Sequence, residues 1–122
     1  MLNDYIFLTE DYDKLIYLSN ILHDIKYKKN IDELYGKYND IDLSCIDKLS
    51  ENQFTELCVL ATYVEQAFNR RGLPGPDWVG NKRLFLSEPK FFLYNSSDLI
   101  LHAPQACLNH NIFLAKSDFE VY

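Results

Sequence analysis

Residues 70–92 constrain the fold more than any other part of this chain of 122 residues. The segment holds three of the four glycines, three of the four prolines and the single tryptophan. Proline fixes φ and lacks the amide hydrogen that a helix needs, so Pro74 and Pro76 exclude a continuous helix here. Gly72 is placed to end a preceding helix. We therefore expect a rigid connection that carries Trp78 as a candidate recognition residue.

A long helix is predicted over residues 11–28. Leucine and isoleucine recur there at intervals of three and four, which places Leu15, Leu18, Leu22 and Ile25 on one buried face. The side chains of residues 9–11 are suited to capping its first turn. A shorter helix is predicted over residues 31–38, and one or two further helical turns over residues 42–49.

A second long helix is predicted over residues 51–71, and its start has the strongest local signal in the chain. Ser50 and Gln53 have the spacing of a capping box, in which each side chain bonds to the other residue's backbone amide. An apolar stripe from Phe54 to Phe68 follows, and the helix is expected to end at two arginines and Gly72. This pattern predicts the central core helix.

The sequence after residue 82 fits helix or strand less clearly. Residues 83–86, 91–94 and 111–115 are compatible with extended backbone, residues 96–98 resemble a helix start, and Pro104 suits the first turn of another helix. The fold class is therefore mainly α: a single compact helical domain with two long helices, several short ones and room for a small β element near the C-terminus. Residues 1–71 would form an acidic helical layer, 72–92 a connection and 93–122 a C-terminal layer.

Charge is divided unevenly along the chain. Residues 1–69 hold 13 acidic and 6 basic side chains, whereas residues 70–122 hold 5 acidic and 6 basic ones. An acidic half disfavours contact with a phosphate backbone and favours a basic partner or simple solubility. The longest apolar runs are three residues, so we expect no membrane span, and the acidic start does not resemble a secretory signal. Cytoplasm is the expected compartment.

Few residues are candidates for catalysis or metal binding. Cys107 with His102 and His110 could supply metal ligands or a nucleophile and its base, but structural zinc needs four ligands, and no glycine-rich oxyanion loop is evident. Buried or capping roles are the simpler interpretation. Three widely spaced cysteines argue against a disulfide framework. We expect no catalytic residue, no metal and no cofactor.

The bases of the glycine- and proline-rich segment suggest an alternative function. With the aromatic rings between them they could form a small nucleic-acid surface, and the bases concerned are Arg70, Arg71, Lys82, Arg83 and Lys90. The overall acidity opposes phosphate binding, so direct nucleic-acid binding is disfavoured. The simpler interpretation is that Trp78 locks the long helix onto the C-terminal layer while the bases pair with acids of the same chain.

Residues 54–119 resemble a segment of small bacterial proteins from toxin–antitoxin and mobile defence loci. The resemblance lies in a helix followed by Gly72-Leu73-Pro74, Pro76 and Trp78, then Pro89 before an aromatic, Ala103-Pro104 and the 111–114 Asn-Ile-Phe-Leu run. It implies an antitoxin-like protein without catalytic residues. The acidic first 50 residues lack the basic recognition helix of a repressor, which favours a protein partner.

The leading hypothesis is a non-enzymatic module that neutralises or regulates a partner protein, one that is basic or handles nucleic acid. An inhibitor from a phage or mobile element that acts as an acidic mimic is an alternative, and a homo-oligomer is compatible with either. Tyrosine, tryptophan and arginine dominate interface energies. The expected partner-binding residues are Trp78, Arg70, Arg71, Lys82, Arg83, Tyr12, Asp13, Asp24, Tyr35 and Tyr38.

Overall fold

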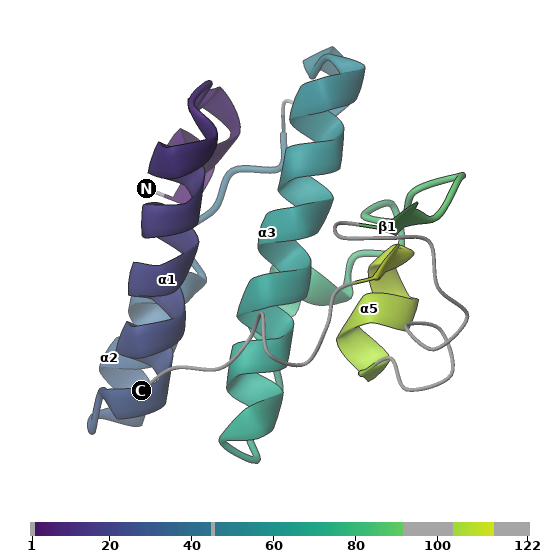
Figure 1. The fold of residues 1–122 in the computed structure, drawn as a ribbon. Helices are drawn as coiled ribbons and strands as arrows, with labels where there is room; N and C mark the ends of the chain where they lie inside the picture. Colours follow the sequence, from purple (N-terminus) through teal and green to yellow (C-terminus); the bar gives the residue numbers. More distant parts are fainter. Residues whose placement is uncertain (1, 45, 92–103, 114–122) are drawn as a thin grey trace.

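A computed structural model describes residues 2–44, 46–91 and 104–113 of the protein (Figure 1). These residues are mainly helical, as predicted. The α-helices are α1 (Asp11–Tyr27), α2 (Ile31–Tyr38), α3 (Glu51–Arg70) and α5 (Gln105–His110). Short 3-10 helices are η1 (Leu2–Phe7), η2 (Ile46–Lys48) and η3 (Asp77–Gly80). Strands β1 (Lys90–Phe91) and β2 (Ile112–Phe113) form a small parallel pair, which is the predicted β element.

Helix α3 has the ends that its sequence predicts. The Ser50 hydroxyl accepts from the Gln53 amide at 3.2 Å, and the Gln53 side chain accepts from the Ser50 amide at 3.0 Å. The helix stops before Gly72, whose φ of 73° lies in the left-handed region that glycine adopts without steric cost. Ten of its 20 residues are buried, which makes it the central core helix.

The other elements are arranged around α3. Helix α1 lies on one side of it and α5 on the other, and η1 also packs against it (Figure 1). Helix α2 reaches the core through Tyr38 and Tyr35, whose rings lie 6.2 Å and 4.9 Å from that of Phe68 on α3. One cluster of buried side chains extends from η1 to β2.

Helix α1 has the predicted length. Its predicted side-chain cap and the predicted burial of Leu15 are wrong. No side chain caps the helix at Glu10; the Glu10 carbonyl accepts from the Lys14 amide instead. Leu15 was expected in the core but is 61% exposed. Leu15 instead lines an open hollow with Val59 and Tyr63 of α3. The 3-10 helix η1, which was not predicted, packs against α3 through its buried residues Leu2, Tyr5 and Ile6.

The glycine- and proline-rich segment packs tightly against α3. A Cβ on Gly75 would lie 2.6 Å from Val79 Cγ2 and 3.6 Å from Glu65 Cγ, so only glycine fits there without a shift. Trp78 and Val79 are buried in η3. The segment connects α3 to the C-terminal residues and is held against α3 by these contacts.

The C-terminal layer follows the predictions where it is described. Pro104 directly precedes α5, and Asn111, at a φ of 60°, ends it. The Lys90 amide donates to the Asn111 carbonyl at 3.1 Å, which joins the two strands. Residues 83–86 are not a strand: the Leu84 amide donates to the Asn81 carbonyl and closes a turn, and the Leu86 amide donates to the His110 carbonyl. The helix start expected at 96–98 and the turn expected at 117–118 lie outside the described residues.

Candidate functional site

A partly buried polar network joins η1, the first turn of α1 and the second turn of α3. The Lys14 ammonium lies 3.2 Å from Glu56 Oε1, and the Tyr5 hydroxyl donates to Glu56 Oε2 at 2.8 Å. The Lys14 and Glu56 side chains are 20% and 18% exposed. Burial, reinforced by the Glu56 carboxylate, raises the pKa of Tyr5 far above its usual value, so the phenol is a neutral donor. The network fixes the spacing of the two helices.

Open hollows lie on both sides of this ion pair. One, of about 360 Å³, contains Phe7, Lys14, Gln53, Glu56 and Lys90 in its lining. The other, of about 280 Å³, has a more apolar lining that includes Asp11, Lys14, Leu15, Glu56 and Tyr63. Because Lys14 and Glu56 line both hollows, they adjoin. We call the two together the α1–α3 cleft.

Large apolar side chains stand exposed at the cleft. Phe7 is 62% exposed and Leu15 61% exposed, although each lines one of the two hollows. Exposed acids accompany them in the same short stretch of chain: Glu10, Asp11 and Asp13. Apolar side chains beside a hollow and next to like-signed charges are typical of a protein-binding surface. Sequence periodicity could not find this cleft, because it assigned Leu15 to the core.

Two of the expected partner-binding aromatics are interior residues. Trp78 is 7% exposed and Tyr38 is 2% exposed, and the Trp78 indole donates to the Tyr38 carbonyl at 2.6 Å. The expectation that they anchor a partner from an exposed position is wrong. The alternative had Trp78 lock the long helix onto the C-terminal layer; Trp78 is indeed buried, but its indole hydrogen bond is to the end of α2 instead.

Asp24 holds α1 to α2. Its Oδ2 accepts from the Tyr38 hydroxyl at 2.7 Å and from Lys37 Nζ at 2.8 Å. Burial opposes ionisation of Asp24, but these two hydrogen bonds and the positive charges of Lys37 and Lys28 together outweigh it and lower its pKa. Burial and the Asp24 carboxylate raise the pKa of Tyr38. Asp24 therefore acts within the fold.

Arg71 and Tyr35 also bind within the chain. Arg71 Nη1 donates to the carbonyls of Ile25 and Lys28, at 2.8 Å and 2.7 Å, and so caps the C-terminal end of α1. The Tyr35 hydroxyl donates to the Pro74 carbonyl. Of the ten expected residues, those that remain exposed are Tyr12, Asp13, Arg70, Lys82 and Arg83.

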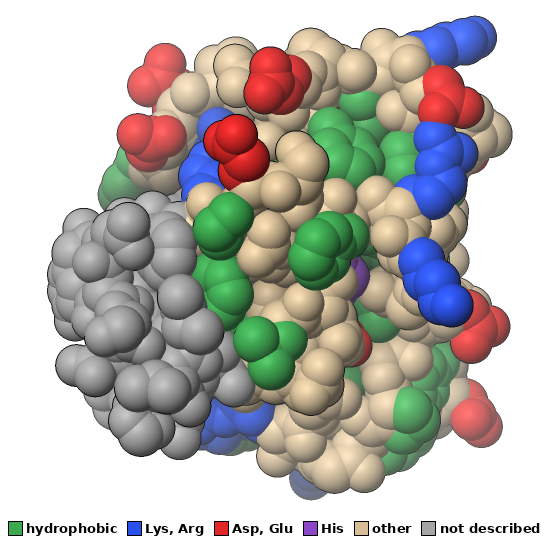
Figure 2. Space-filling view, turned by 90° about the vertical axis from the view of Figure 1, so that its right-hand side faces the viewer, with side chains coloured by type: hydrophobic (Ala, Val, Ile, Leu, Met, Phe, Trp, Pro, Cys, Tyr) green, Lys and Arg blue, Asp and Glu red, His purple; other side chains and the backbone are tan. Residues whose placement is uncertain are grey.

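The bases of residues 70–90 do not gather in one patch. Lys90 lines a hollow with Gln53 near the start of α3, whereas Arg70 is the last residue of that helix. A rise of about 1.5 Å per residue places these ends roughly 25 Å apart. Arg83 pairs with Asp47. Figure 2 shows Lys and Arg side chains spread along one edge of the α5 side, with Asp and Glu beside them. This spread weakens the nucleic-acid alternative.

Cys107 and His110 belong to the packing of α5. His110 is 1% exposed; its Nδ1 lies 2.6 Å from the Leu84 carbonyl and its Nε2 lies 2.9 Å from Glu65 Oε2. Both ring nitrogens are therefore already bonded. Cys107 and Cys58 are buried, and burial raises the pKa of the Cys58 thiol to about 12. His102 lies outside the described residues.

The described residues contain neither a candidate metal site nor a candidate membrane span. Residues 2–44, 46–91 and 104–113 contain no group of three or more His, Cys, Asp or Glu side chains placed to hold a metal ion. None of the helices among them combines the length and apolar character that a membrane crossing requires.

Comparisons with known proteins return no match. No protein-family model, no curated protein and no solved structure matches this chain.

Proposed function

We propose that this protein is a non-enzymatic module that binds a partner protein and neutralises or regulates it, in the way of an antitoxin or an immunity protein. The α1–α3 cleft is the surface that would receive the partner. The observation that carries the proposal is the exposure of Phe7 and Leu15 at two adjoining hollows. Exposing two large apolar side chains to water is unfavourable, and burying them against a partner would recover that free energy.

Charge selects the class of partner. Asp11 lines the cleft, and the exposed acids Glu10 and Asp13 are close to it in the chain. Two bases also line the cleft, Lys14 and Lys90, and Lys14 is paired with Glu56. A partner that presents lysine or arginine around an apolar side chain would complement this surface, and the acids would speed its association at low salt. Toxins and other proteins that act on nucleic acid commonly present such basic surfaces.

The test is capture with a matched pair of variants. The tagged chain is incubated with lysate of its native host as wild type, as Phe7→Ser with Leu15→Ser, and as Phe85→Ser. Phe85 is 48% exposed and lies outside the cleft, so its variant controls for a general loss of apolar surface. We expect one basic protein to bind wild type and Phe85→Ser, and the double variant to bind it about ten-fold more weakly or worse.

Neutralisation is tested by co-expression. The captured protein is expressed alone and with each variant, and growth is followed. Relief of a growth defect, or loss of an activity, by wild type and by Phe85→Ser but not by the double variant would support the proposal. Equal capture by all three chains, or capture of no protein by wild type, would overturn it.

A further inference from the structure

The smaller and more apolar hollow of the α1–α3 cleft has two carboxylates in its lining. Asp11 comes from the first turn of α1, and Glu56 comes from α3. Both act on the same phenol. The Tyr5 hydroxyl donates to Glu56 Oε2 at 2.8 Å, and the pKa of Tyr5 is raised first by burial, then by the charge of Glu56 and more weakly by that of Asp11. The two carboxylates therefore lie near one hydroxyl group.

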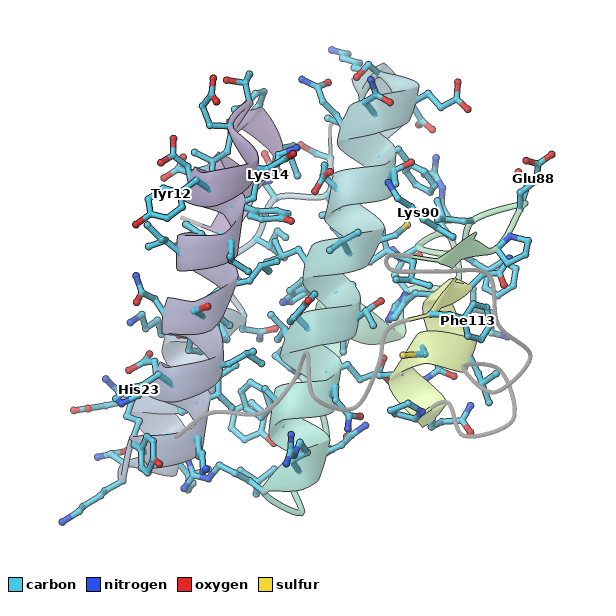
Figure 3. The ribbon with its side chains drawn as sticks, viewed as in Figure 1. Tyr12, Lys14, His23, Glu88, Lys90 and Phe113 are labelled. Atoms are coloured by element: carbon cyan, nitrogen blue, oxygen red, sulfur yellow. The ribbon has the colours of Figure 1, made fainter. Side chains whose placement is uncertain are left out.

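The charge of this lining is not balanced. Lys14 also lines the hollow, and Figure 3 shows it pointing from α1 toward α3, whereas Tyr12 points away. The Lys14 ammonium lies 3.2 Å from Glu56 Oε1. Within residues 2–44, 46–91 and 104–113, no ion pair or hydrogen bond engages the Asp11 side chain. The lining therefore carries one negative charge that the described part of the chain leaves uncompensated.

The Glu56 carboxylate can accept further hydrogen bonds. Its Oε1 accepts from Lys14 and its Oε2 from Tyr5, and each carboxylate oxygen has two lone pairs. Glu56 lines both hollows, and its side chain is 18% exposed, so it can be reached from the cleft. A cation that enters the hollow can thus contact Asp11 and Glu56 while Lys14 stays in place.

The apolar walls and the size of the hollow suit one side chain. Leu15, Leu18 and Val59 line it together with the carboxylates. Small-molecule sites commonly measure about 300–1,000 Å³, and this hollow of about 280 Å³ lies below that range. Leu15 is 61% exposed and would be covered by an aliphatic stem that lies along it. The complementary group therefore has an apolar stem and a cationic head.

We propose that this hollow receives an arginine side chain of the partner protein, with its guanidinium between Asp11 and Glu56 and its stem along Leu15. The inference rests on the proposed function and names the residue by which the partner is anchored. A guanidinium is planar and permanently charged, and its fork of donors reaches two carboxylates at once, whereas the ammonium of lysine is a compact point charge. Arginine is also among the residues that dominate interface energies.

The first experiment uses N-acetylarginine amide, whose one charge is the guanidinium. It is added to the isotope-labelled full chain, and the amide signals are followed by NMR up to about 50 mM. We expect saturable shifts at the residues that line the hollow, with a dissociation constant of about 1–10 mM. The uncharged citrulline analogue should bind at least about ten-fold more weakly, and the lysine analogue more weakly than arginine. The absence of saturable shifts, or equal binding of citrulline or lysine, overturns the proposal.

Asp11 and Asp13 provide a matched pair of variants. Both stand in the first turn of α1 and both are exposed, and of the two it is Asp11 that lines the hollow. Asp11→Asn should weaken binding of the arginine probe by about three-fold or more, whereas Asp13→Asn should leave it unchanged. Signals far from α1 report whether each variant is folded. Equal weakening by both variants would mean that net charge alone attracts the probe, and it overturns the proposal, as does unchanged binding by Asp11→Asn.

The same variants relate the hollow to the captured partner. Replacing the inserted arginine of the partner by alanine should weaken its binding to wild type and to Asp13→Asn, but have little further effect on Asp11→Asn. If no arginine of the partner behaves in this way, the inference is overturned, while capture itself still supports the proposed function. Capture of no protein by a chain that binds the arginine probe overturns the proposed function instead.

Discussion

The Trp78 indole nitrogen donates to the carbonyl of Tyr38 across 2.6 Å, which links η3 to the end of α2. The ring is buried, and the hydroxyl of the same Tyr38 donates to Asp24 on α1. One tyrosine thus joins three segments that are distant in sequence. Several effects of substitution follow from this and similar contacts.

Replacing Trp78 should separate the contribution of its hydrogen bond from that of its ring. Trp78→Phe leaves the Tyr38 carbonyl without its donor and should lower the free energy of unfolding by about 1–3 kcal/mol. Trp78→Ala adds a cavity and should lower it by about 3–5 kcal/mol. Urea unfolding followed by circular dichroism measures both. Equal losses for the two variants would contradict the assigned hydrogen bond.

Two glycine-to-alanine substitutions should change stability in opposite directions. The added Cβ at Gly75 meets Val79 at 2.6 Å, so Gly75→Ala should destabilise by about 1–3 kcal/mol. Gly36 lies inside α2 with open space around it, and Gly36→Ala should stabilise by about 0.5–1 kcal/mol. The midpoint temperature of thermal unfolding is measured for both variants. A shift in the same direction in both would contradict the prediction.

The neighbouring arginines 70 and 71 form a matched pair for the cap of α1. Arg71→Met removes the donor to Ile25 and Lys28 and should cost about 1.5–3 kcal/mol. Arg70 is exposed, and Arg70→Met should change stability by less than about 0.5 kcal/mol. The difference is tested by comparing the urea concentrations at the unfolding midpoints of the two variants, provided that their m-values are equal. A similar loss in both variants would mean that charge rather than the cap is responsible.

Asp24 should make stability fall in acid. Its pKa is lower in the folded protein than in the unfolded chain, so protons bind the unfolded chain more tightly. The stabilisation is complete above the unfolded value and is lost as the pH falls through about 4 toward the folded value. Asp24→Asn should therefore flatten the fall in unfolding free energy between about pH 5 and pH 3. Asp32→Asn, an exposed change on α2, serves as control; an unchanged slope in Asp24→Asn would contradict this assignment.

Thiol labelling tests the alternative of a cysteine enzyme. Cys58 and Cys107 are both buried, and burial raises the pKa of Cys58 to about 12. In a Cys45→Ser variant, neither remaining thiol should react with a disulfide reagent at neutral pH until the protein is unfolded. Rapid labelling of Cys107 in the native protein would revive the nucleophile interpretation.

Signals within one element were sufficient to predict the helices. The Ser50 and Gln53 capping box, the apolar stripe of α3 and the stop at Gly72 all act within a few residues, and all three are present in the structure. The segment around Trp78 was predicted as a rigid connection for the same reason. Such features depend on local spacing rather than on what packs nearby.

The cleft is formed by tertiary contacts between elements, which the spacing of apolar residues within one helix does not predict. Leu15 continues the apolar spacing of α1, yet it is 61% exposed and lines an open hollow with Val59 and Tyr63. Tyr38 was expected at a surface because tyrosines anchor interfaces, yet its partners Asp24 and Trp78 come from other elements.

Because α3 lies at the centre of the fold, the outer elements should unfold locally before α3 does. Helix α3 contacts η1, α1, η3, α5 and β2, so an outer element can detach while α3 keeps its other neighbours. Buried amides of α3 should then exchange with deuterium only through global unfolding, and those of η1 and α5 through smaller openings. The α1–α3 cleft is lined by residues of η1, α1 and α3 and by Lys90. A partner bound there should slow exchange in η1 and α1 and leave α5 unchanged, which gives a map of binding that needs no substitution.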